Sequence, residues 1–164
     1  MNILEKYNIY DRHFYEIIRD LIDSEVVRKM DNFIQHGSTS TLEHCLNVSY
    51  SSYKMALALK LDYVSTARGA LLHDLYLYDW HKLPKEKHFF KQHGFVHASL
   101  ALKNANKYFK LNDVEKDIIE KHMWPLTLRK LPLYRESVLV SVMDKCVSSK
   151  ETLAPYVHKL TEIV

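Results

Sequence analysis

Six side chains able to bind a metal ion recur along the sequence, and helical spacing directs several of them toward a core. They are His44, His73, Asp74, His97, His122 and Asp144. Imidazole and carboxylate ligands together suit Fe, Mn, Co, Ni or Zn better than the all-oxygen cages that hold Mg or Ca. The set therefore predicts a nitrogen-rich site for a divalent transition metal.

The position of these residues on their helices supports that prediction. His122 follows Ile118 by four residues and Asp144 follows Val140 by four, so both polar groups lie on apolar stripes. A buried charge without a partner is strongly destabilising, and ligation to a shared metal would remove that cost. A single histidine on an apolar face is more often a hydrogen-bonded core residue than a ligand, so the prediction depends on the whole set.

Helices are the elements expected to position these side chains. Only three Gly and four Pro among 164 residues leave little material for the many tight turns of a β-sandwich or barrel. Apolar spacing in the first ~35 residues predicts two short helices that meet near Asp23 and Ser24. Ser40 and Glu43 have the spacing of a capping box, so a long helix should begin there and run to about Lys60.

The helix that carries His73 and Asp74 is expected to start near Asp62 or Ser65, since either residue is able to cap it. The segment 75–92 has no clean period and reads as a loop or broken turn. Helical spacing then resumes over residues 94–109.

Two further helices complete the pattern. Asn112 and Glu115 again have capping-box spacing, and the helix that they begin should end at Pro125. The last helix is predicted to run from about Leu133 to Leu153, with Pro155 beyond it. The elements together predict an all-α fold.

The composition is that of one compact globular domain, expected to span residues 1–164. Hydrophobic residues make up 47% of the chain and charged residues 26%. The net charge of +3 comes from scattered residues, which argues against a large nucleic-acid surface. No stretch approaches ~18 apolar residues, so no membrane or targeting segment is expected. Cys45 and Cys146 form no CxxC pair, which fits a reducing cytoplasm.

The order of the six residues resembles the H…HD…H…H…D signature of the HD-domain superfamily of metal-dependent phosphohydrolases. The matching segments are TLEHCLNVS, ARGALLHDL, HGFVHASLAL, IIEKHMWPL and VLVSVMDKCVSSKE. The resemblance therefore covers residues 41–151 and implies a helical bundle of the HD-domain type. The helices of residues 1–37 are expected to pack on that core.

The resemblance also implies roles for the candidate ligands. A first ion would be bound by the minimal quartet of the superfamily: His44, His73, Asp74 and Asp144. His97 and His122 resemble the added ligands of the members that bind two ions, in which Asp74 is the bridge. Two ions roughly 3.5–4 Å apart polarise a phosphoryl group and generate hydroxide near neutral pH. The implied substrate is a small phosphate mono- or diester, with nucleotides among the candidates.

Besides Asp74, Lys145 is the candidate catalytic residue, because its charge lies next to Asp144 in the sequence and suits a phosphate. A helix residue one step from a ligand points about 100° away, so a solvated or structural lysine is the alternative.

The pattern departs from some members after the dipeptide. The sequence HDLYL places Tyr76 and Leu77 where some hydrolases and oxygenases carry Gly-Lys, and Leu77 where certain nucleotidases carry Glu. What remains resembles the small, stand-alone bacterial members. A di-iron oxygenase of the myo-inositol oxygenase type and a non-catalytic regulatory module stay open as alternatives, and so does the oligomeric state.

Overall fold

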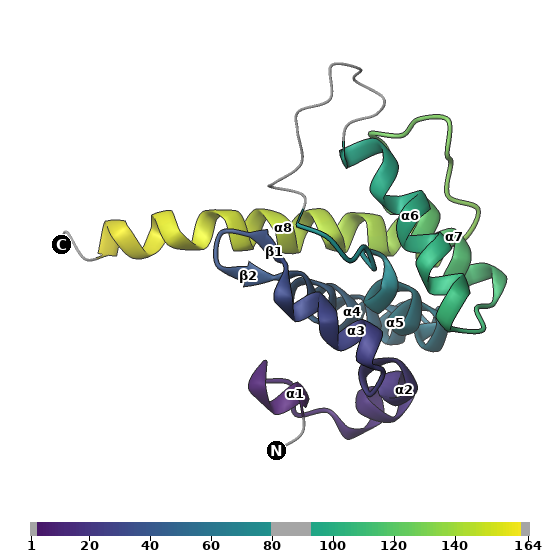
Figure 1. Ribbon diagram of the computed structural model, residues 1–164, viewed down its shortest axis with the longest axis horizontal. Helices are drawn as coiled ribbons and strands as arrows, with labels where there is room; N and C mark the ends of the chain where they lie inside the picture. The colour runs from purple at the N-terminus through teal and green to yellow at the C-terminus, as the bar shows by residue number, and fades with distance from the viewer. Residues whose placement is uncertain (1–2, 80–92, 162–164) are drawn as a thin grey trace.

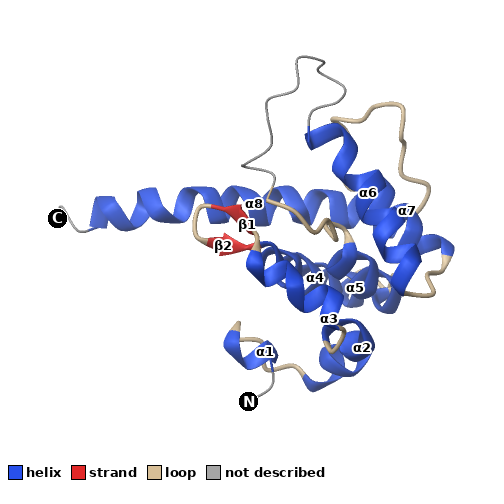
Figure 2. Ribbon diagram, in the orientation of Figure 1, coloured by secondary structure: helices blue, strands red, loops and turns tan. Residues whose placement is uncertain are grey.

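The computed structural model describes residues 3–79 and 93–161, and within them the predicted all-α fold is confirmed (Figure 2). The helices are α1 (Ile3–Lys6), α2 (Arg12–Ile22), α3 (Glu25–Arg28), the 3₁₀ helix η1 (Lys29–Asn32), α4 (Thr41–Ala58), α5 (Tyr63–Leu72), α6 (His93–Tyr108), α7 (Asp113–Lys121) and α8 (Arg135–Thr161). Two short strands, β1 (Ile34–His36) and β2 (Thr39–Ser40), pair antiparallel before α4. No helix in these ranges combines the length and apolar character needed to cross a membrane.

The predicted starts of three helices are confirmed by their caps. The Ser40 hydroxyl accepts a hydrogen bond from the backbone N–H of Glu43 at 3.2 Å and begins α4. The Asp62 carboxylate caps α5 in the same way. Asn112 and Glu115 form the complete capping box at α7, in which each side chain accepts from the other residue's N–H. Local chemistry therefore fixes where these helices begin.

Two predictions about the backbone differ from the structure. No strand was predicted before α4, yet the chain turns at Gly37, which has a φ of 55°, and the residues on either side pair as β1 and β2. The final helix does not end at Leu153, since α8 continues through Pro155 to Thr161. Proline removes one backbone donor, yet its fixed φ is compatible with a helix, so it need not end one.

The helices that will hold the candidate ligands pack on one another. α4 packs against α5 and α8, and α7 lies against α5, α6 and α8. The main core lies where α2 meets α4 and α5, and it includes Phe14, Ile18, Leu46 and Leu71, all fully buried. α8 runs along the other helices, and its C-terminal half extends beyond them (Figure 1).

Arg68 on α5 ties three helices together. Its Nε donates to a Glu115 carboxylate oxygen on α7 at 2.8 Å, and its two terminal nitrogens donate to Asp20 on α2 at 2.5 and 3.0 Å. The Arg68 and Glu115 side chains are 17% and 4% exposed, so solvent screens their ion pair less than it screens a surface pair, whereas Asp20 is 61% exposed. We propose from this link that residues 1–37 and the core 41–151 fold as one unit.

A glycine sets the distance between α5 and α7. A Cβ atom added at Gly69 would lie 2.9 Å from Cδ1 and 3.0 Å from Cβ of Ile118. The Cβ of Ile118 cannot move unless its helix moves. One turn further along the two helices stand His73 and His122, whose ring centroids are 4.8 Å apart. The close approach at Gly69 therefore positions two of the candidate ligands.

We expect Gly69→Ala to lower the free energy of unfolding by about 1–3 kcal/mol, because the added methyl group overpacks this contact. Denaturant unfolding of the metal-free protein measures the loss. Ile118→Ala creates a cavity and should itself cost about 2–5 kcal/mol. The double variant should lose less than the sum of the two single losses, because each change makes room for the other. Strictly additive losses would contradict the overpacking account.

Candidate metal centre

The structure brings all six predicted metal ligands together from five helices. His44 lies in the first turn of α4, His97 on α6 and Asp144 on α8, while His73 and His122 are the C-cap residues of α5 and α7 and Asp74 follows His73. Every one of these residues is buried, and Asp144 has the largest exposed fraction, 8% of the whole residue. Segments far apart in the sequence thus form one polar cluster inside an apolar bundle.

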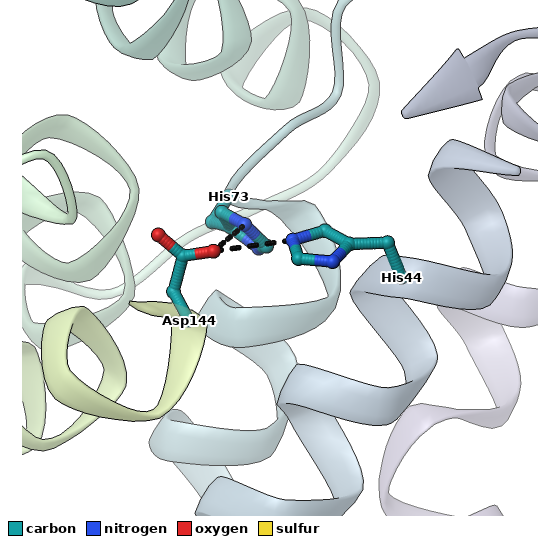
Figure 3. Close-up of side chains that lie close together, drawn as sticks. All are labelled: His44, His73 and Asp144. Carbon is teal, nitrogen blue, oxygen red and sulfur yellow. Dashed lines mark hydrogen bonds and ion pairs between the residues drawn. The ribbon is translucent and has the colours of Figure 1, made fainter. Parts of the chain in front are cut away.

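His44, His73 and Asp144 form the first ligand group (Figure 3). One oxygen of Asp144, Oδ1, lies 3.1 Å from Nε2 of His44 and 3.7 Å from Nε2 of His73. Two atoms that bind the same ion at about 2.0–2.2 Å lie roughly 3–3.5 Å apart. The three side chains are therefore close to the spacing that a shared ion requires.

Asp74 stands between this group and a second one. Its Oδ2 lies 3.5 Å from Nε2 of His73. Its Oδ1 lies 3.2 Å from Nε2 of His97 and 3.5 Å from Nε2 of His122, and these two nitrogens are 2.9 Å apart. Each oxygen of Asp74 thus faces a different set of histidines, which is the position that a bridging carboxylate would occupy.

Backbone carbonyls fix the orientation of two imidazoles. Nδ1 of His73 lies 2.7 Å from the carbonyl oxygen of Ala70, and Nδ1 of His122 lies 2.9 Å from that of Ile119. A carbonyl oxygen only accepts, so each Nδ1 carries the proton. Nε2 of each ring therefore faces the cluster, and once it carries no proton its lone pair can bind a metal ion.

Two atoms at the centre of the cluster are buried without a hydrogen bond in the described parts of the chain. They are Nε2 of His73 and Oδ1 of Asp74. A buried polar atom that forms no hydrogen bond costs about 1–3 kcal/mol. A bound cation would satisfy both atoms at once, and the mixed nitrogen and oxygen donors suit a divalent transition metal. The His/Asp cluster fits a metal site.

The charges of the cluster are strongly coupled. Burial lowers the pKa of His44, but its hydrogen bonds to Asp144 and Glu151 outweigh burial and raise that pKa to about 10. Burial, reinforced by repulsion from His73, lowers the pKa of His122 to about 3. Burial opposes ionisation of Asp74, yet the charge of His73 holds the pKa of that carboxyl below its usual range. Without a cation, imidazolium groups therefore balance the carboxylates, and metal binding has to displace their protons.

Gln35 contacts the centre, although sequence reasoning did not select it. Its amide Nε2 donates to Oδ2 of Asp74 at 2.7 Å, and its Oε1 accepts a hydrogen bond from the Tyr76 hydroxyl. Both side chains are buried. Gln35 lies in β1, a strand of three residues that is too short to show an alternating pattern. No sequence pattern marks it, and only the fold shows that β1 reaches Asp74.

Lys145 does not contact the carboxylates of the cluster. Its ammonium group donates to the backbone carbonyl of His122 at 3.1 Å and to the carbonyl and hydroxyl oxygens of Ser141, each at 3.0 Å. These three bonds use all three ammonium donors. The bonds connect the C-terminal end of α7 to α8. A phosphate-binding role for Lys145 stays a prediction.

Comparison with known proteins identifies the family. A family description named HD domain matches residues 41–148, which is more than half of the chain. The chain belongs to the HD-domain family. The resemblance drawn from the H…HD…H…H…D order is thereby confirmed, and all six cluster residues lie within the match. Neither the search of curated proteins nor that of solved structures gave a match. Two residues that contact the HD-domain cluster, Gln35 and Glu151, lie outside the matched range.

Proposed function

We propose that this HD-domain protein hydrolyses a phosphate mono- or diester at a centre of two divalent transition-metal ions. The observation that carries the proposal is the position of Asp74, which presents Oδ2 to His73 and Oδ1 to His97 and His122. A carboxylate shared in this way is suited to two ions rather than one. Small phosphorylated metabolites, nucleotides among them, are the proposed substrates.

The six side chains divide between the two proposed ions. His44, His73 and Asp144 would hold the first with Asp74, while His97 and His122 would hold the second with the same carboxylate. Bound divalent cations supply Lewis acidity toward a phosphoryl oxygen and lower the pKa of a bound water. The choice among Fe, Mn, Co, Ni and Zn is left to experiment.

The protein's own contribution is a fixed, buried arrangement of donors. Gln35 holds one oxygen of Asp74, and the carbonyls of Ala70 and Ile119 hold the rings of His73 and His122. Side chains oriented in advance need no reorganisation when charge develops on a reacting phosphate. Burial of the cluster also limits the access of bulk water, which strengthens every electrostatic interaction within it.

Metal analysis followed by a phosphatase assay tests the proposal. Protein purified without a chelator should contain about two transition-metal ions per chain and release nitrophenol from a nitrophenyl phosphate monoester or the corresponding diester. A chelator should abolish the release, and added metal should restore it. Protein without stoichiometric metal would contradict the proposal. Iron with visible absorption and oxygen consumption, but no hydrolysis, would instead support the oxygenase alternative.

A further inference from the structure

Glu151 lies on α8 about two helical turns after Asp144, so the two carboxylates project from the same side of that helix. Both contact one imidazole. Oδ1 of Asp144 lies 3.1 Å from Nε2 of His44, and Oε2 of Glu151 lies 2.8 Å from Nδ1 of the same ring. The His44 ring is fully buried and the Glu151 side chain is only 9% exposed. The Glu151 carboxylate is therefore shielded from bulk solvent at the point of contact.

The Glu151 contact determines which nitrogen of His44 faces the cluster. An ionised carboxylate only accepts hydrogen bonds, so Nδ1 carries the proton that points to Glu151. Nε2 is then the nitrogen that faces Asp144 and the cluster. The other Glu151 oxygen accepts a hydrogen bond from the Asn47 amide at 3.2 Å, a link between α4 and α8 that does not involve the His44 ring.

The position of His44 on its helix explains why a carboxylate is needed. His73 and His122 lie at the C-terminal ends of α5 and α7, where unpaired backbone carbonyls accept their Nδ1 protons. His44 lies in the first turn of α4, where the unpaired backbone groups are N–H donors. Those donors cannot accept a proton from an imidazole, so the acceptor has to come from another element.

We propose that Glu151 is a positioning residue that orients His44 for cation binding, a proposal that rests on the proposed metal centre. Ligand histidines commonly donate their second ring N–H to a carboxylate, which fixes the tautomer and raises the basicity of the ligand nitrogen. Glu151 lies within α8, three residues beyond the matched HD-domain range.

The affinity for Zn²⁺ tests the assignment, measured by competition with a chromophoric chelator on the full chain. Glu151→Ala should weaken the binding of one ion about 10–100-fold and leave the other ion's affinity close to that of the unmodified protein. The Zn²⁺ affinity of Glu151→Gln should lie between those of the unmodified protein and Glu151→Ala, because the amide oxygen still accepts from Nδ1 but carries no charge. Long-range proton–nitrogen NMR of the zinc-loaded protein should show His44 protonated at Nδ1, and Glu151→Ala should weaken or abolish that signal.

Two control variants separate positioning from simple helix packing. Asn47→Ala removes a link between α4 and α8 but leaves the contact between His44 and Glu151. Glu136→Gln alters a carboxylate on the same helix that accepts from the backbone N–H of Asp62. Both should bind two ions with nearly unchanged affinity.

Unchanged Zn²⁺ affinity in Glu151→Ala, or an equal loss in Asn47→Ala, would overturn the role of Glu151 alone. The proposed metal centre would still stand in either case. Failure of the unmodified protein to bind Zn²⁺ would overturn the proposed function itself, and the role of Glu151 with it.

Discussion

Replacing Asp74 by alanine is expected to remove both metal ions from the protein and, with them, hydrolysis of a phosphate ester. Asp74 is the one cluster side chain whose two oxygens face different histidine sets, so its loss weakens both ligand groups together. Removing a residue that only hydrogen-bonds to a ligand weakens metal binding by up to about 100-fold. Loss of Asp74, a proposed ligand of both ions, should weaken metal binding by more than that. Metal analysis after gel filtration and the nitrophenyl phosphate assay measure the two losses.

A conservative change and a matched control show that this effect is specific. Asp74→Asn keeps the size of the side chain and an oxygen that accepts from Gln35, yet it should also lose metal, because the negative charge is gone. Asp117→Asn alters another buried carboxylate, which accepts from the backbone N–H of Leu133 and the hydroxyl of Ser137. It should lower stability and keep both ions. Two ions retained in Asp74→Ala would show that Asp74 is no bridge.

Replacing His122 by alanine is expected to leave about one ion per chain. His122 belongs to the group of His97 and Asp74, and its Nε2 lies 2.9 Å from that of His97. The other group, built on His44, His73 and Asp144, keeps its short contacts without it. Hydrolysis should fall steeply, because two-metal chemistry stabilises both the attacking and the leaving oxygen.

His13→Ala is the matched control for the His122 variant. His13 lies outside the cluster and contacts the Tyr53 hydroxyl through Nδ1 at 2.7 Å. That variant should bind two ions and hydrolyse the ester at the rate of the unmodified protein. Retention of two ions by His122→Ala would rule out the two-ion arrangement, whereas loss of both would mean that the two groups bind only together.

The sequence predicted most of the helical framework because caps are local. The side chains of Ser40, Asp62 and Asn112 each accept a hydrogen bond from a backbone N–H only three residues away, so each marks a helix start within a short stretch of sequence. The extension of α8 past Pro155 was missed, since proline is compatible with a helix as well as with its end. The β-hairpin was missed because its strands, of three and two residues, are too short to show an alternating pattern.

The sequence also predicted which six side chains the structure brings together, but not what holds them in place. Residue type and order identify His and Asp as candidate ligands wherever the fold places them. The supports are found only through contacts distant in the chain: Gln35 reaches Asp74 across 39 residues, and Glu151 reaches His44 across 107. No local periodicity in the sequence indicates such a distant contact. Whether the six residues bind metal remains the prediction that the variants above test.

The separation of His44 and Asp144 has a consequence for how the chain unfolds. The two side chains meet across 100 residues. An ion held by both would act as a removable crosslink between α4 and α8, closing a loop that contains most of the bundle. Covalent closure of a loop of that length restricts the unfolded chain by about 4–5 kcal/mol in the chain-entropy account. The proposed centre would therefore also stabilise the fold as a crosslink. The metal-bound chain would resist unfolding until its ions were released.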